Sequence, residues 1–320
     1  MPQPSAGQVH AVDVPLTNIS TAYMQDDMRF IATKVFPIVP VEKQTDKYYT
    51  YTKNDWFRDE AEKRADAQES AGSGYGLSTA GYSCDVFALH KDIGSQALAN
   101  SDPAIDLERD ATQFLTQRML LRQEIQWVSD CFGSSIWGTD ITPANLWSDY
   151  TNGNPIEDVE TGKETILSST GQVANTLVLG YQVYRKLKNH PTIIDRIKYV
   201  TSVDGRVITP ALLAAMFDVE RVFLASAVKA TNVEGETAAY AFTHGKHALL
   251  CHVAPNPGLL VPSAGYTFTW NGVSAGLGSE VAITRFDMPH LKATRVEIET
   301  AFDNKIVGTD LGYFFASVVA

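Results

Sequence analysis

A long stretch that cannot bury itself constrains the fold of this chain more than any other feature. From Ala61 to Tyr82 the sequence reads AEKRADAQESAGSGYGLSTAGY, rich first in charged side chains and then in glycine. Such a segment has too few apolar side chains to form a core of its own. Structureless loops of this length are uncommon in compact domains unless they have a function. The sequence therefore predicts a projecting loop that another copy of the chain covers.

β-prone segments flank this loop on both sides. Tyr48, Tyr49 and Tyr51 favour a strand from about Lys47 to Lys53, and YSCDVFALH, starting at Tyr82, is apolar and β-prone again. Aromatic residues are enriched where interfaces concentrate their energy, so the loop and its base hold the candidate contacts between subunits. These candidates are Tyr49, Tyr51, Trp56, Phe57, Arg58, Lys63 and Arg64.

The composition is that of a folded globular protein. The chain has 320 residues, 44% of them hydrophobic and 20% charged, and it is long enough for two lobes. A formal net charge of −11 and the lack of a Lys or Arg cluster argue against direct DNA binding.

The cysteines and the apolar runs indicate the compartment. Cys84, Cys131 and Cys251 are widely spaced and odd in number, which favours buried thiols in a reducing environment over disulfides. No apolar run is long enough for a membrane span, and the first residues lack a leader pattern, so a cytosolic protein is expected.

A long helix is predicted from about Pro103 to Phe132. Asp102 can cap it, Pro103 suits its first position, and Gly133 provides a stop. Its length would be roughly 45 Å. The expected apolar stripe, which implies cover along one side only, is Leu107, Ala111, Phe114, Leu121, Ile125, Val128 and Phe132.

The second half of the chain alternates short strands and helices. Strands are expected in NTLVLG, RIKYV, RVFLASAVKAT and HALLCHVA. Helices are expected from Tyr181 to Lys188 and from Thr209 and Pro210 through ALLAAMF. TRVEIETAF alternates as a half-buried strand does, and the chain ends in an apolar strand, YFFASVV.

Several patterns invite a chemical interpretation, but each favours a structural one. His244, Lys246, His247 and His252 invite a metal site, but two histidines three residues apart need a third ligand in a suitable geometry, and ordinary strand-edge histidines are expected. Ser226 and Lys229 match a Ser-x-x-Lys nucleophile without its companion motifs. GKET at 162–165 lacks the upstream glycine of a phosphate loop.

The tryptophans are also expected to have a structural role. Trp127, Trp137 and Trp147 are expected to pack in the core and at the lobe junction rather than to form a ligand box. No catalytic, cofactor-binding or metal-ligating residue is predicted.

The order of the elements resembles that of tailed-bacteriophage major capsid proteins. Four stretches carry the resemblance: FIATKVFPIVPVEKQTDKYYTYTKNDWFRDEAEKR, IDLERDATQFLTQRMLLRQEIQWVSDCF, NTLVLGYQVYRKLKNHPTIIDRIKY and LLAAMFDVERVFLASAVKATNVEG. Together they place nearly the whole chain in this α+β fold. The resemblance implies an N-terminal arm (1–46), an extended β-hairpin loop (47–89), a peripheral domain with a long spine helix and β-sheet (90–170), an axial α/β domain (171–284), and a return to the peripheral domain with a C-terminal strand (285–320).

The implied function is that of a structural shell protein without enzymatic activity or cofactor. Copies would self-assemble through hexamers and pentamers into the icosahedral head shell that encloses the phage double-stranded DNA. Implied partners are a scaffolding protein and a portal, with room for a decoration protein. Because no long charged helical segment precedes the arm, a separate scaffold or an already removed segment is expected. The protein would be assembled in the host cytoplasm, away from membranes, and end in the virion capsid.

Two alternatives and one modification remain open. The same fold would suit a cellular encapsulin-like compartment that loads enzyme cargo, and a soluble α/β hydrolase using Ser226 or the histidines is an unrelated alternative. Some relatives join a loop lysine to a neighbour's asparagine by an isopeptide bond. Lys63 and Asn304 could form such a pair, although a solvated Lys63 is the favoured interpretation.

Overall fold

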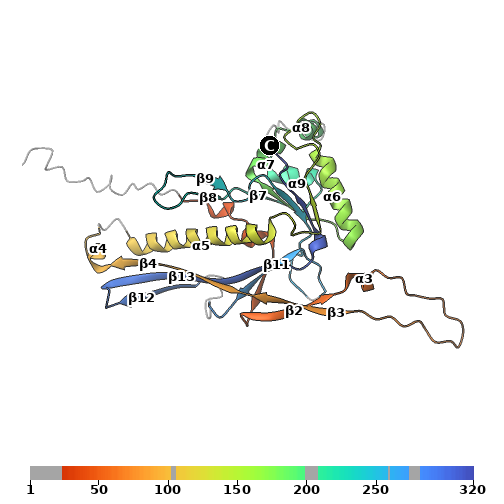
Figure 1. Cartoon of the computed structure of the whole chain (residues 1–320), viewed down its shortest axis with the longest axis horizontal. Helices are drawn as coiled ribbons and strands as arrows, with labels where there is room; N and C mark the ends of the chain where they lie inside the picture. Colours follow the sequence, from red (N-terminus) through yellow and green to blue (C-terminus); the bar gives the residue numbers. More distant parts are fainter. Residues whose placement is uncertain (1–23, 102–105, 199–207, 259, 274–281) are drawn as a thin grey trace, which may run out of the picture.

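The computed structural model describes residues 24–101, 106–198, 208–258, 260–273 and 282–320. These residues form two lobes and a projecting hairpin (Figure 1). Residues 1–23 of the expected arm and the expected cap, Asp102 with Pro103, lie outside the described residues. Within the described ranges, none of the helices combines the length and apolar character that a bilayer crossing requires.

The first lobe consists of one long helix lying along one sheet. The helix is α5 (Leu107–Cys131), and the strand order is β1-β11-β13-β12 with β4 also paired to β13. The strands are β1 (Ile38–Val41), β4 (Asp85–Gly94), β11 (Gly265–Trp270), β12 (Ala282–Met288) and β13 (Ala293–Ile306). The predicted alternation of TRVEIETAF is confirmed, because Val296 and Ile298 pack in one core cluster with Ala111 and Leu115 of α5. We call this unit the α5 lobe.

The long helix is confirmed, but its start and its buried stripe differ from the prediction. Asp106 caps it, accepting hydrogen bonds from the backbone N–H groups of Glu108 and Arg109 at 3.1 Å each. Phe114 was expected in the stripe and is 47% exposed. Helical spacing alone does not determine which side of this helix is buried, because apolar side chains occur on more than one side of it. The buried positions are Ala111, Leu115, Met119, Gln123, Glu124, Trp127 and Cys131.

The second lobe contains a sheet that is buried on both faces. The strand order is β5-β14-β10-β6-β7. Leu177 and Leu179 enter the core beneath the helices, whereas Val178 enters the core beneath α5, as the alternation of side chains along a strand requires. The strands are β5 (Thr139–Ile141), β6 (Thr176–Gly180), β7 (Arg221–Ala225), β10 (Ala248–Cys251) and β14 (Gly312–Phe315).

Helices α6 (Pro155–Thr170), α7 (Tyr181–Leu187), α8 (Pro191–Lys198) and α9 (Pro210–Met216) contribute side chains to one core cluster of this sheet. The expected strands at β6 and β10 and the expected helices at α7 and α9 are confirmed. RVFLASAVKAT was expected as one strand but forms two, β7 and β8 (Val228–Ala230), which belong to different sheets. We call this unit the α6–α9 lobe.

Three expectations for the α6–α9 lobe were wrong or incomplete. The RIKYV strand is wrong for Arg196 to Lys198, which continue α8, and its last two residues lie outside the described residues. Short apolar runs do not distinguish strand from helix. Helix α6 was not predicted. The final strand ends at Phe315, since Ser317 adopts a positive φ of 48° and the N–H of Val318 donates to the Lys246 carbonyl at 3.0 Å.

The remaining described elements are short. They are η2 (Asp27–Arg29), α2 (Ala32–Val35), α4 (Ser95–Ala99), η3 (Thr309–Leu311), the β8–β9 hairpin (Val228–Ala230 and Tyr240–Phe242), and the projecting hairpin of β2 (Thr45–Tyr51) and β3 (Leu77–Ser83) with α3 (Lys53–Trp56) at its base.

The three cysteines and Trp127, Trp137 and Trp147 lie in the interior, as predicted. Cys84, Cys131 and Cys251 are buried free thiols. Burial raises the pKa of Cys84 to about 11 and that of Cys251 to about 12, which disfavours the reactive thiolate. Trp127 and Trp137 pack in the core between the lobes, and Trp147 packs in the core of the α6–α9 lobe.

Gly180, at the end of β6, gives a test of this packing. A Cβ added there would collide with the backbone carbonyl oxygen of Gly245. We expect Gly180→Ala to lower the free energy of unfolding by about 1 to 3 kcal/mol, as overpacking in a core does, in urea denaturation followed by circular dichroism. Gly94→Ala is the matched control, because a Cβ at Gly94 meets no atom within 4 Å. Equal stabilities of the two variants would contradict the packing described.

Candidate subunit interface

The β2–β3 hairpin holds the projecting loop at its base. The strands pair antiparallel, with Tyr51 opposite Leu77. Tyr48 and Tyr82 stack on Phe268 of the first sheet, with ring centroids 5.6 and 4.6 Å away. The predicted strand is confirmed with shifted bounds, since Lys53 already begins α3. Every residue at 61–79 is exposed, and the tip extends away from both lobes (Figure 1).

Three exposed aromatic rings gather at the base of this loop. Tyr51, Trp56 and Tyr75 lie with ring centroids 5.9 to 6.1 Å apart and are 36%, 56% and 66% exposed. We call these three residues the loop-base cluster. Tyr75 was missed in the sequence because it stands alone among glycines, and only the return of the chain toward β3 brings it to Tyr51.

The other predicted contact residues lie around this cluster or farther along the loop. Tyr49 is 61% exposed, and Phe57 is 62% exposed although its ring lies against Gly171 at the end of α6. The guanidinium of Arg58 is 3.6 Å from the Glu60 carboxylate. Lys63 and Arg64 are exposed on the tip. The structure therefore brings Tyr51 and Trp56 together and leaves the loop cations apart from them.

Polar contacts fix the base of the loop to the body of the chain. Lys53 of α3 forms an ion pair with Asp310 of η3. The N–H of Gly76 donates to the Asp55 carboxylate at 2.8 Å, and the N–H of Thr52 donates to the Gly76 carbonyl at 3.3 Å. The base is thus fixed, while the residues beyond it make few contacts with their own chain.

A buried carboxylate joins the segment before β1 to α5. Oε2 of Glu124 accepts hydrogen bonds from the backbone N–H groups of Ile31 and Ala32 at 2.9 and 2.8 Å. Its Oε1 lies 3.6 Å from Nδ1 of His244, and both side chains are fully buried. The ring of His244 packs at 4.8 Å from that of Phe132. The expectation of strand-edge histidines is therefore wrong for His244, which lies between the lobes.

Burial controls the protonation of this pair. Burial raises the pKa of Glu124 to about 7, against the lowering effect of the two N–H donors. Burial also lowers the pKa of His244 to about 3, with His247 as a lesser cause. Each group is thus driven toward its neutral form, as expected for titratable groups in an apolar environment.

The other candidate chemical sites are engaged in structure. His247 accepts a hydrogen bond from the N–H of Ser317 at 3.0 Å, and His252 Nδ1 lies 2.7 Å from the Val173 carbonyl oxygen. In the described part of the chain no three His, Cys, Asp or Glu residues could hold a metal ion. The GKET segment lies within α6, and Ser226 lies between β7 and β8.

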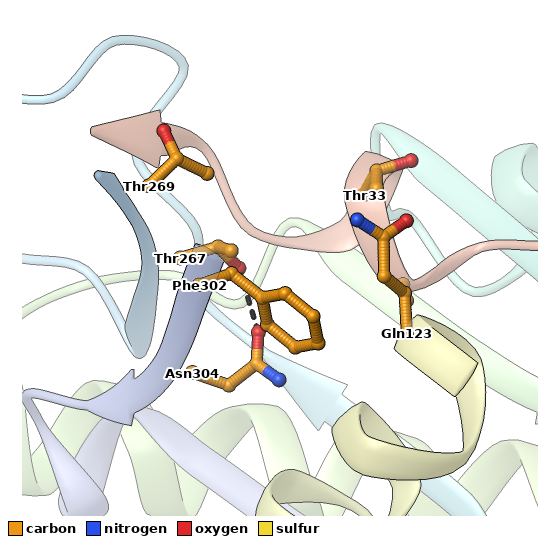
Figure 2. A pocket seen from close by; sticks show the side chains of 7 residues that line it. Thr33, Gln123, Thr267, Thr269, Phe302 and Asn304 are labelled. Carbon is orange, nitrogen blue, oxygen red and sulfur yellow. Dashed lines mark hydrogen bonds between the residues drawn. The ribbon is translucent and has the colours of Figure 1, made fainter. Parts of the chain in front are cut away.

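A small polar cavity separates α2, α5 and the first sheet (Figure 2). Its volume of about 10 Å³ suits a single water molecule. Asn304, on its wall, is 8% exposed; its Oδ1 accepts from the Thr267 hydroxyl at 3.0 Å, and its Nδ2 donates to Asp130 at 3.3 Å. Lys63 is exposed, which agrees with the favoured interpretation of a solvated lysine, and its crosslink to Asn304 stays the less favoured alternative.

Solved structures show which class of fold this is. A phage-related protein from Bordetella bronchiseptica RB50 superimposes with a TM-score of 0.69 at 22% identity, covering 92% of this chain and 94% of that one. The capsid of cyanophage P-SCSP1u gives 0.60 at 9% identity, covering 93% and 90%. The SrpI encapsulin of Synechococcus elongatus PCC 7942 gives 0.53 at 10% identity, covering 96% and 95%. The chain has the fold of phage capsid proteins, as the sequence predicted.

Curated relatives point to one group within this class. The major capsid protein of Burkholderia phage BcepMu is 27% identical over 320 residues, which cover 97% of this chain and 98% of that protein. The major capsid protein of Pseudomonas phage JBD67 is 24% identical, covering 97% of each. No family model matches the chain. The resemblance to phage major capsid proteins is confirmed over nearly the whole length.

The buried carboxylate gives a pH test. Because the folded protein holds a proton on Glu124 up to about pH 7, and the unfolded chain releases it near pH 4.5, the stability that this group contributes falls as pH rises between those values. Glu124→Gln cannot titrate. We expect its free energy of unfolding, relative to the parent protein, to rise by about 2 to 3 kcal/mol from pH 4.5 to 7.5 in urea denaturation. A constant or falling difference would contradict the assignment.

Proposed function

We propose that this chain is the major capsid protein of a tailed phage, which self-assembles into the icosahedral shell enclosing double-stranded DNA. The observation that carries the proposal is an exposed loop at 61–79, held at a fixed base, in a chain with the phage capsid fold. A neighbouring copy would supply the cover that the loop lacks in its own chain. Repeated around a closed shell, such a contact covers the loop of every copy.

The lobes have different roles in this proposal. The α5 lobe is the peripheral domain, the α6–α9 lobe is the axial domain, and the extended loop ends at 84 rather than at 89, because β4 pairs with β13 from Asp85 onward. Helix α6 packs in the core of the second sheet and β14 pairs with β10, so we begin the axial domain at Pro155 rather than at 171 and include β14. Strands β11 and β12 pair with β13, so they go with the peripheral domain.

The proposed assembly involves partner proteins and takes place in a particular compartment. We infer hexamers and pentamers as the building units, with a scaffolding protein, a portal and room for a decoration protein. Assembly would take place in the host cytoplasm and end in the virion. The net charge of −11 suits a shell that encloses DNA without binding it specifically.

The role of the protein is structural rather than enzymatic. The soluble hydrolase has little support, because Ser226 forms no hydrogen bond with Lys229 or with a histidine among the described residues. A cellular compartment is the second candidate, favoured by the likeness to the SrpI encapsulin. Electron microscopy and nucleic-acid analysis of purified particles separate the two: packaged DNA and a portal vertex support the phage head, and an enzyme cargo without DNA supports the compartment.

The loop-base cluster gives a direct test of assembly. We expect Trp56→Ala combined with Tyr75→Ala to reduce sedimentable shells at least roughly tenfold, because aromatic anchors carry much of an interface's energy. The isolated subunit should keep its free energy of unfolding within about 1 kcal/mol, since both rings are more than half exposed.

Trp56→Phe combined with Tyr75→Phe is the matched control. It keeps both aromatic rings, and shells should form at close to the parent yield in sucrose-gradient sedimentation. Full assembly of the alanine variant would contradict an interface role for this cluster.

A further inference from the structure

A basic groove lies in the α6–α9 lobe between α7, the end of β9 and the C-terminus. Its volume is about 380 Å³. The rings of Tyr181 and Phe242 stack in its wall with centroids 5.3 Å apart. Arg185, Lys186 and Lys246 also line it. We call it the α7 groove, and it combines an aromatic surface with three cations.

The cations of the α7 groove lack carboxylate partners in the described part of the chain. Ala320 lines the same groove. Among the described residues, none of Arg185, Lys186 and Lys246 forms an ion pair with it or with a side-chain carboxylate. Such a concentration of positive charge in a protein of net charge −11 is a binding surface for an acidic group.

Helix α6 presents a complementary surface. Glu157, Glu160, Glu164 and Leu167 recur at spacings of three, four and three, so they share one side of the helix. All four are exposed, and Leu167 is 46% exposed. Among the four, only Glu160 has an ion-pair partner in the described part of the chain, the half-exposed Arg196 at 3.6 Å. We call this side the α6 face: three carboxylates followed by one exposed apolar side chain.

The two surfaces cannot meet within one chain. Figure 1 shows α6 and α7 on opposite sides of the lobe, and both are fixed on the same core, to which Ile166 of α6 and Leu187 of α7 contribute. Two different complementary surfaces on one molecule form a head-to-tail contact. Repeated by rotation, such a contact closes a ring.

We propose that the α7 groove binds the α6 face of a second copy of this chain. The carboxylates of Glu160 and Glu164 meet the cations of the groove, and Leu167 lies against the stacked rings of Tyr181 and Phe242. The inference rests on the proposed shell function and names the contact that joins neighbouring axial domains around a ring.

Charge reversal on each side tests the contact. One variant carries Arg185→Glu with Lys186→Glu, and the other carries Glu160→Lys with Glu164→Lys. Each alone should lose rings and shells by roughly tenfold or more, because like charges across an interface are strongly unfavourable. Lys188→Glu and Glu220→Lys are matched controls: both positions are exposed, and Lys188 follows α7 outside the groove.

Mixing the two variants separates a lost contact from a misfolded subunit. In the mixture the acidic groove of one variant meets the basic α6 face of the other, and the reverse pairing closes the next contact. Alternation fits a ring of six but not a ring of five. We therefore expect electron microscopy to show six-membered rings or open sheets and tubes from the mixture, and few closed shells.

The outcomes distinguish this inference from the function on which it rests. If either variant alone assembles like the parent, the groove serves another ligand, such as a nucleic-acid phosphate, and the inference is overturned. Failure of the mixture to assemble, with both variants folded by circular dichroism, overturns it as well. If the parent protein forms neither rings nor shells with any scaffold, the proposed function itself fails.

Discussion

The structure depends on a sheet that is buried on both faces between two layers of helices. Leu177 and Leu179 on one side and Val178 on the other commit β6 to two cores at once. The helices α6 to α9 fill the first core, while α5 and α2 fill the second. Because the second core is shared, the long helix and the α6–α9 lobe cannot separate without exposing Trp127 and Phe314. The carboxyl group of Glu124 adds a directional contact to this core, because it accepts hydrogen bonds from the N–H groups of Ile31 and Ala32.

The packed lobes fix the position of the exposed loop at its base. Stacking of Tyr48 and Tyr82 on Phe268 and the ion pair of Lys53 with Asp310 fix where the loop begins. Ordering the residues beyond that base would cost conformational entropy, and few contacts within the chain offset this cost. In the proposed shell, a neighbouring copy supplies the missing contacts. A rigid platform with an uncompensated extension is what a self-assembling shell requires of each subunit.

The two proposed contacts differ in physical character. The loop-base cluster offers aromatic surface, which gains free energy from burial and tolerates salt. The α7 groove and the α6 face offer charges, whose attraction sets orientation and weakens as salt screens it. The strengths of the two proposed contacts should therefore respond differently to salt.

The sequence by itself determined many of the local elements, though not helix α6, and it indicated the class of fold. The charged side chains and glycines at 61–79 predicted a loop that cannot be buried in a core, and the tyrosines before it predicted a strand. Local patterns also indicated α5, β6, α7, α9 and β10. Only the tertiary structure decided which side of α5 is buried, that Arg196 continues a helix, that Tyr75 joins Tyr51, and that His244 lies beside Glu124. The reason is physical: a local pattern reports which side chains avoid water, whereas pairing between distant segments decides what they meet instead.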